Sequence, residues 1–222
     1  VATHPTPFMG DNTMMGLNDL EQDALTEIFN IGVGVAAAAV FEMTGEHVPV
    51  SVPMVEMTNQ RLAIDHFLSR EQRQLCAIRQ TFRSGFSCDA VLMFPAETQL
   101  HLVRMMVGPD FPEADLGDMA EDAMGELGNI MLYAVISTLA SSLAVRLQGT
   151  LPEVSLIQAD AAFARRADTP GTADGDAPVL SLMIDFELGA NHVGGYLAFL
   201  LDSDSSQVLL NRLAAHIGAT PL

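Results

Sequence analysis

The chain has 222 residues, of which 49% are hydrophobic, and its formal net charge is −18 with only 10 basic residues. This length suits one medium domain, or two half-domains fused by duplication, with enough apolar side chains for a sizeable core. The acidic balance excludes nucleic acids and anionic membranes as expected partners, because no basic stripe is present to meet phosphate groups.

Residues 1–16 are rich in proline, threonine and glycine and are predicted to form a flexible tail. They lack the basic and apolar segments of a signal peptide. The chain has no uninterrupted apolar run of about 18 residues, so no membrane-spanning helix is predicted. We therefore expect a cytoplasmic protein whose cysteines, Cys76 and Cys88, are reduced and buried, with a disulfide between them as the alternative.

The first half of the chain begins with a long predicted helix. Asn18 is its expected N-cap, with Glu21 at the third position as in a capping box, and the helix runs to Met43 before Gly45 ends it. A β-branched segment, a short helix, two strands joined by a tight turn and a closing helix are predicted next, at residues 48–57, 59–68, 75–83, 87–94 and 96–107.

The second half repeats this order. Asp118 is expected to cap its long helix, with Glu121 at the third position and Gly149 at the end. The elements that follow are predicted at residues 151–157, 159–166, 179–188, 193–201 and 203–217. Residues 166–177 form an additional Pro/Gly/Asp-rich segment with no clear equivalent in the first half, which we expect to be an exposed, mobile insertion. Its acidic residues lack the ligand spacing of a calcium loop, so no calcium site is expected there.

Tight turns between sequence-adjacent strands predict antiparallel pairing. The expected fold is therefore mixed α/β (α+β): a pseudo-twofold duplication in which two long helices pack on antiparallel β-sheet. We predict a single domain over residues 17–222, made of two repeats at 17–112 and 113–222. The β-branched segment of each half contains a proline and is expected to be an edge or bulged strand, because proline lacks the N–H that a central strand uses.

A polar motif, Asp-x-x-x-Glu-x-x-Asn followed by a proline, occurs once in each half. Adding 99 to each position of the first copy gives the second: Asp23, Glu27, Asn30 and Pro53, then Asp122, Glu126, Asn129 and Pro152. Spacings of four and three place the polar residues of each copy on one face of a helix. A solvated stripe inherited by duplication would explain this pattern without any function. Asparagine is nevertheless unfavourable in mid-helix, so its recurrence makes these residues candidates for chemistry.

These residues resemble the signature of the CheC/CheX/FliY family of chemotaxis phosphatases. The match includes the 22 residues that separate Asn30 from Pro53 and Asn129 from Pro152. The resemblance extends over residues 17–218. Two complete motifs make the chain similar to CheC more than to CheX, which carries one.

The resemblance implies hydrolysis of the aspartyl phosphate of a CheY-type response regulator. Asn30 and Asn129 would orient the attacking water, and Glu27 and Glu126 would engage a lysine of the regulator. The chain itself would bind no metal and no other cofactor, since Mg²⁺ is expected on the partner.

The other motif residues are expected to act in support. Asp23 and Asp122 would assist docking or the start of the helix, and Pro53 and Pro152 would shape the neighbouring strands, with no role in the chemistry.

The two copies differ one turn after the asparagine. The first helix has Gly34, in a run of small residues typical of close helix packing, and the second has Tyr133. Tyr133 would either contact the regulator or crowd Asn129. We therefore expect two competent sites that work at unequal rates.

Other functions remain open on the same residues. One is a non-catalytic module that binds a response regulator or a CheD-type deamidase, and another is a scaffold or flagellar-switch component with vestigial motifs. No Ser-His-Asp signature, phosphate-binding loop or metal-spaced His or Cys cluster offers different chemistry, and the six histidines are scattered. Two equivalent halves in one chain favour a monomer, because duplication supplies internally what a one-motif relative could gain by dimerising.

Overall fold

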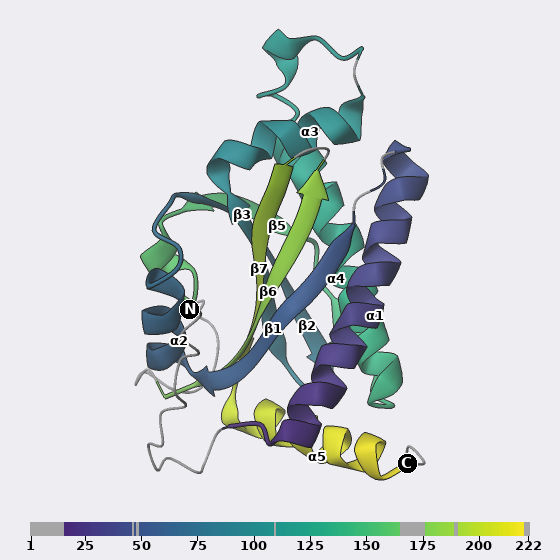
Figure 1. Ribbon diagram of the computed structural model, residues 1–222, viewed down its shortest axis with the longest axis vertical. Coiled ribbons are helices and arrows are strands. Elements are labelled where there is room, and N and C mark those ends of the chain that lie inside the picture. Colours follow the sequence, from purple (N-terminus) through teal and green to yellow (C-terminus); the bar gives the residue numbers. More distant parts are fainter. Residues whose placement is uncertain are drawn as a thin grey trace, which may run out of the picture.

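The fold is a computed structural model that describes residues 16–164 and 176–219, except residues 46, 48, 109, 189 and 190. It contains α-helices, short 3₁₀ turns and one antiparallel sheet (Figure 1). The α-helices are α1 (Asp19–Thr44), α2 (Gln60–Leu68), α3 (Gln99–Val107), α4 (Ala120–Ser142) and α5 (Ser203–Ala219). The 3₁₀ turns are η1 (Ala96–Thr98), η2 (Glu113–Asp115) and η3 (Ala159–Ala161). The strands are β1 (Val50–Asn59), β2 (Leu75–Ser84), β3 (Cys88–Pro95), β4 (Leu147–Gly149), β5 (Glu153–Ile157), β6 (Pro178–Leu188) and β7 (Asn191–Leu201).

The sheet has the strand order β1-β6-β7-β3-β2-β4, and β5 also pairs with β2. All of these pairs are antiparallel, as predicted. The order is symmetric about the central β7–β3 pair, since hairpins β6–β7 and β2–β3 lie inside and the proline-containing segments lie at the two edges. Strand β1, from the first half, pairs with the hairpin of the second half, and β4 and β5 pair with the hairpin of the first. The two halves therefore exchange their edge strands.

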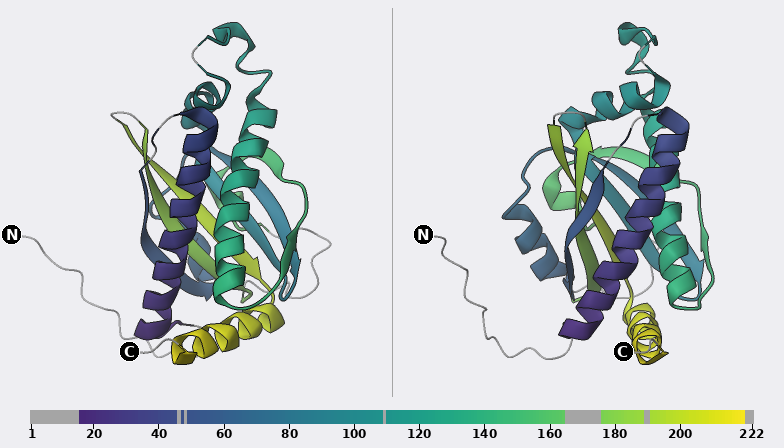
Figure 2. Two further views of the ribbon diagram at one scale, coloured as in Figure 1. Left: turned by 90° about the vertical axis from the view of Figure 1, so that its right-hand side faces the viewer. Right: turned by 45° about the vertical axis from the view of Figure 1, so that its right-hand side comes forward.

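Helices α1 and α4 lie side by side and run in opposite directions over one face of the sheet (Figure 2). Their apolar sides fill a core against that face, with Phe29, Leu25, Leu127 and Met124 almost fully buried. A second, smaller core lies on the opposite face, where α2 and η3 cover the sheet. The predicted arrangement of two long helices on antiparallel sheet is thus confirmed.

The two long helices are held close by a glycine. A Cβ placed on Gly32 of α1 would lie 3.0 Å from the Cα of Val135 on α4. The expected role of small residues in helix packing therefore holds at Gly32. It does not hold at Gly34, where an added Cβ would meet no atom within 4 Å.

Helix α1 begins and ends as predicted. Asn18 and Glu21 form a reciprocal capping box, and Gly45 closes the helix in the left-handed region at φ 72°. Both features satisfy backbone groups that the helix ends leave without partners.

The predicted bounds of the second long helix are wrong. Met119, not Asp118, occupies the N-cap position of α4, and the helix ends at Ser142 instead of continuing to Gly149. Ala144, at φ 51°, turns the chain so that residues 147–149 form β4 beside β2. Val145 and Leu147, two residues apart, both pack on the core, an alternation typical of a strand. Over so short a segment, apolar residues also fit the helical pattern that the sequence predicts.

The remaining elements lie close to their predicted positions, with one further correction. Within its described residues, 159–164, the helical patch predicted at residues 159–166 contains only the single turn η3. The insertion predicted at 166–177 falls largely outside the described residues, as does the N-terminal tail. Cys76 and Cys88 lie on the β2–β3 hairpin as buried, free thiols. The division into repeats at 17–112 and 113–222 remains a prediction.

Helices α1 and α4 are long and apolar enough to cross a membrane by length and composition alone. Each instead buries its apolar side against the sheet and the other helix, and exposes the acidic residues of its motif. This is the pattern of an amphipathic helix in the core of a folded domain.

Candidate functional site

The polar residues of the first motif form one exposed row on α1. Asp23, Glu27 and Asn30 are all exposed, while Ile28 and Phe29 between them are buried against the sheet. Glu27 makes no hydrogen bond or ion pair with a described residue, so its carboxylate is free to meet a group from outside. The predicted outward row is therefore present.

Asn30 is oriented by a contact with the neighbouring edge strand. Its Oδ1 accepts a hydrogen bond of 3.1 Å from the backbone N–H of Val52 on β1. A backbone N–H can only donate, so this contact fixes which end of the amide is the oxygen. The amide nitrogen makes no hydrogen bond with a described residue and keeps both of its N–H donors.

A β-bulge makes the Val52 N–H available to the helix. Ser51 pairs with Asp185 and Met54 with Met183, so the two residues Val52 and Pro53 oppose the single residue Ile184. A bulged residue leaves the ladder, and proline has no N–H to contribute to it. The prediction of a bulged edge strand is confirmed for β1, and the bulge explains why a proline can follow Val52.

The second proline segment carries a similar irregularity. Gly149 pairs with Phe82, and Glu153 pairs with Arg79. Three residues of this edge, 150–152, therefore oppose two residues of β2, and the extra residue separates β4 from β5. Pro152 is thus at an interruption of the edge, as Pro53 is.

The second polar row, on α4, is arranged less openly than the first. Asp122 and Glu126 are exposed and Asn129 is half-buried. The Oδ1 of Asn129 lies 3.5 Å from the Nε2 of Gln80 on β2, which is the long end of the hydrogen-bond range. Leu151, at the position matching Val52, is 86% exposed and makes no hydrogen bond with Asn129.

The two rows lie on opposite flanks of the helical layer and form two separate sites. Asn30 faces β1 at one edge of the sheet, and Asn129 faces β2 beside β4 and β5 at the other. Between them, α1 and α4 pack on each other through Gly32 and Val135. Each site therefore has its own helix, its own edge strand and its own asparagine.

The residues one turn after the asparagines make the sites different. Gly34 presents bare backbone at the first site, whereas the Tyr133 side chain at the second is 65% exposed. Tyr133 also borders a groove of about 280 Å³ between α4 and β4. The other residues lining this groove are Phe82, Ile136, Ser137, Ala140, Ser141, Val145, Arg146, Leu147 and Gln148.

Exposed apolar side chains surround the first row as well. Ile31 and Val35 on α1 are 50% and 48% exposed, beside Asn30 and Gly34. Apolar residues grouped around a few polar ones are the composition of a protein-binding surface. Both rows therefore fit a macromolecular partner better than a small ligand.

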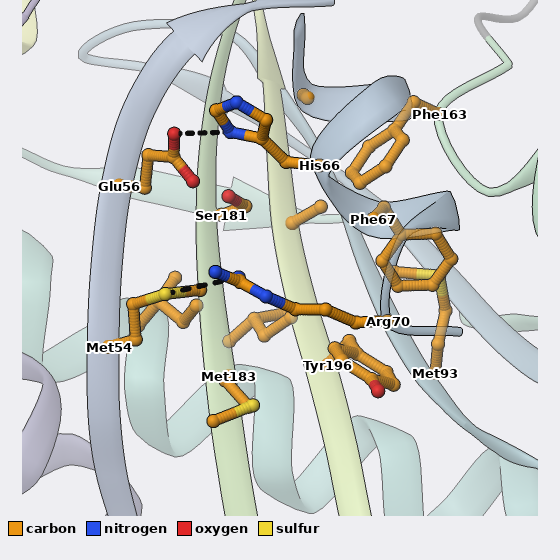
Figure 3. A pocket seen from close by; sticks show the side chains of 14 residues that line it. Met54, Glu56, His66, Phe67, Arg70, Met93, Phe163, Ser181, Met183 and Tyr196 are labelled. Atoms are coloured by element: carbon orange, nitrogen blue, oxygen red, sulfur yellow. Dashed lines mark hydrogen bonds and ion pairs between the residues drawn. The ribbon is translucent and has the colours of Figure 1, made fainter. Parts of the chain in front are cut away.

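A pocket on the opposite face of the sheet has no connection with either row (Figure 3). Its wall includes Phe67 and Tyr196, and at its mouth the Nδ1 of His66 lies 2.7 Å from a carboxylate oxygen of Glu56. The pocket has a cavity volume of about 30 Å³, which is room for about two water molecules. As it stands, this pocket has room for a few small atoms and not for a bulky ligand.

No other chemistry competes with the two rows among the described residues. That part of the chain contains no group of three or more His, Cys, Asp or Glu side chains placed to hold a metal. Burial raises the pKa of the Cys76 thiol to about 11 and, with the charges of Asp89 and Asp202, raises the pKa of Cys88 even further. Neither thiol is therefore activated as a nucleophile.

Comparison with models of known protein families finds none that matches this chain. Among individual proteins, the chain is 24% identical over 205 residues to the CheY-P phosphatase CheC of Bacillus subtilis, covering 91% of this chain and 98% of that protein. It is 25% identical over 143 residues to the flagellar motor switch phosphatase FliY of the same organism, covering 64% of this chain and 37% of FliY. Among solved structures, FliY of Thermotoga maritima has the same fold, with a TM-score of 0.71 and 19% identity over 90% of this chain and 98% of that one.

Proposed function

The chain is a CheC-family protein homologous to CheC and FliY, and on that premise we propose that it hydrolyses the aspartyl phosphate of a CheY-type response regulator in chemotaxis signalling. The similarity to the CheY-P phosphatase CheC of Bacillus subtilis supports this substrate. The proposed place of action is the cytoplasm, where such a regulator works.

The reaction needs little from the enzyme beyond orientation. An aspartyl phosphate is an acyl phosphate, and the oxygen of a water in line with the scissile bond attacks its phosphorus. The P–O bond to the aspartyl carboxylate breaks, which releases inorganic phosphate and a free aspartate. Holding that water in line is worth a large factor in rate because it replaces a chance encounter by a fixed geometry.

Asn30 and Asn129 are the proposed water-orienting groups. A neutral amide can donate to and accept from a water without adding negative charge beside the phosphoryl group. The observation that carries the proposal is the Asn30–Val52 hydrogen bond, which holds the amide still and leaves its N–H donors outside. The amide oxygen keeps a second lone pair for the water.

Glu27 and Glu126 are proposed to bind a lysine of the regulator, each one turn before its asparagine. Both carboxylates are exposed and lack an ion-pair partner among the described residues, so each can form a charge-assisted hydrogen bond across the interface. In this proposal, Mg²⁺ is held by the regulator and not by this chain. Asp23 and Asp122, each one turn before the glutamate of its row, would assist docking.

A non-catalytic binding module remains the second candidate. The same rows could bind a phosphorylated regulator without hydrolysing its phosphate, or the chain could bind a CheD-type deamidase. Mixing a small amount of the chain with excess phosphorylated regulator and Mg²⁺, and following phosphate release, separates the two. Release of many phosphates per chain supports the enzyme. Unchanged release at every ratio of chain to regulator would leave only the binding function.

A further inference from the structure

Gln80 is a polar residue on the apolar side of β2. The other residues on this side of the strand, Cys76, Ile78 and Phe82, all belong to the core beneath α1 and α4. The Gln80 side chain is only 3% exposed. Burying an amide in such a position costs free energy unless its polar atoms are hydrogen-bonded.

The contacts of Gln80 all point to the second site. Its Nε2 donates a hydrogen bond of 2.6 Å to the carbonyl oxygen of Thr150, in the interruption between β4 and β5. The same nitrogen lies 3.5 Å from the Oδ1 of Asn129. Its Oε1 is buried and has no hydrogen-bond partner in the part of the chain that the structure describes. Gln80 therefore joins Asn129 to the edge of the sheet, at the cost of one unsatisfied oxygen.

The first site has no equivalent of this side chain. Val55 pairs with Leu182 and Val154 pairs with Ile78, so the residue that matches Gln80 is Ile184, which is buried and apolar. At the first site a backbone N–H, from Val52, holds the asparagine instead. The two sites thus supply a donor to the asparagine oxygen by different means.

We propose that Gln80 is a positioning residue of the second site, which holds the Asn129 amide by linking it to the Thr150 carbonyl. This inference rests on the proposed phosphatase function. The 3.5 Å contact is expected to shorten when a regulator docks on α4, because catalytic hydrogen bonds are often long in the unbound enzyme. Gln80 acts only through Asn129 and does not touch the phosphoryl group.

The substitutions Gln80→Met and Gln80→Leu test this role, because each replaces the amide by an apolar side chain of similar size. Each is combined with Asn30→Ala, which leaves only the second site, and separately with Asn129→Ala, which leaves only the first. In the Asn30→Ala background, we expect kcat for phosphate release to fall by about threefold to tenfold with KM little changed, as for loss of one hydrogen bond.

The ratio of variant to parent activity distinguishes positioning from general damage to the fold. The loss is expected to be confined to the Asn30→Ala background. Ile184→Val, a conservative change at the matching core position, serves as the control and is expected to affect neither site selectively. Equal losses in both backgrounds, or no loss when only the second site remains, would overturn the proposal.

A spectroscopic measurement keeps the test independent of activity. The side-chain amide signals of Asn30 and Asn129 can be assigned in ¹⁵N-labelled protein by their disappearance in the two alanine variants. Gln80→Met is expected to shift the Asn129 signals and leave those of Asn30 in place. Unchanged Asn129 signals would refute the positioning role, whereas a shift in a chain without phosphatase activity would refute only the proposed function.

Discussion

The side-chain oxygen of Asn30 accepts a 3.1 Å hydrogen bond from the backbone N–H of Val52, 22 residues further along the chain. This contact joins the helix that carries the motif to the bulge that carries the proline. In the first copy of the motif, it gives a structural reason for the asparagine and the proline segment to occur together although they lie far apart in the chain. The bulge interrupts the strand pairing beside the proline, and the Val52 N–H is then available to hold the asparagine.

Replacing Asn30 by Asp is expected to separate the structural role of the side chain from its proposed catalytic role. An aspartate oxygen can still accept from Val52, so stability should change little. Asn30→Ala should lower the free energy of unfolding by about 0.5–1.5 kcal/mol, the usual worth of one hydrogen bond. Urea denaturation measures the free energy of unfolding of both variants. In the Asn129→Ala background both variants should lose phosphatase activity, because Asp adds negative charge and lacks the N–H donors. An active Asn30→Asp enzyme would contradict the neutral-amide role.

Exchanging Gly34 and Tyr133 tests the origin of the difference between the sites. Space is open at Gly34, so Gly34→Tyr should fold without strain. Tyr133 is 65% exposed, and we expect its ring to contact the regulator. Tyr133→Gly should therefore raise KM several-fold at the second site, and Gly34→Tyr should lower KM at the first, each measured with the other asparagine replaced by Ala. A higher kcat in Tyr133→Gly would mean instead that the ring crowds Asn129.

Gly128 is expected to be essential for seating α4 on β2. A Cβ at this position would overlap the Cγ2 of Ile78, so Gly128→Ala must push the helix away from the strand. Overpacking of this kind costs about 1–3 kcal/mol, which urea denaturation would detect, and it should also draw Asn129 away from Gln80. Gly125→Ala is the matched control, because its Cβ would make only an ordinary 3.7 Å contact with Val154. Equal stabilities of the two variants would contradict the packing described.

Glu71 should make a contribution to stability that disappears in acid. Its carboxylate is 1% exposed, and hydrogen bonds from the Arg73 side chain, the shortest at 2.6 Å, hold its pKa below the usual value. A lowered folded-state pKa stabilises the protein above the unfolded pKa, near 4.5, and the effect is lost as pH falls through the folded value. Glu71→Gln should cost about 1–2 kcal/mol at pH 7. That difference should shrink progressively below about pH 4.5; a difference that stays constant down to pH 3 would contradict this account.

Much of the architecture could be predicted because local chemistry and tertiary packing agree. The Asn18–Glu21 capping box and the Gly45 stop are local features, and packing does not override them in α1. The end of α4 could not be predicted, because residues 143–147 are apolar except for Arg146, a pattern that suits both a helix and a strand. Pairing with β2 decides between the two.

The candidate rows were visible in the sequence, but the groups that hold their asparagines were not. Val52 acts through its backbone N–H, which leaves no trace in residue type, and its availability depends on a bulge opposite Ile184. Gln80 did leave a trace, as a polar residue at an otherwise apolar alternate position of β2. Its partner Asn129 became evident only when the strand pairing placed β2 beside α4 and the second proline segment.

The central claim is that Asn30 and Asn129 carry the phosphatase reaction, and the Asn30→Ala/Asn129→Ala double variant tests it most directly. Phosphate release from a phosphorylated CheY-type regulator with Mg²⁺ should be accelerated by the parent chain. It should be accelerated less by each single variant, to different extents, and should return to the unassisted rate with the folded double variant. A double variant that still accelerates phosphate release as the parent does would contradict the assignment of both asparagines.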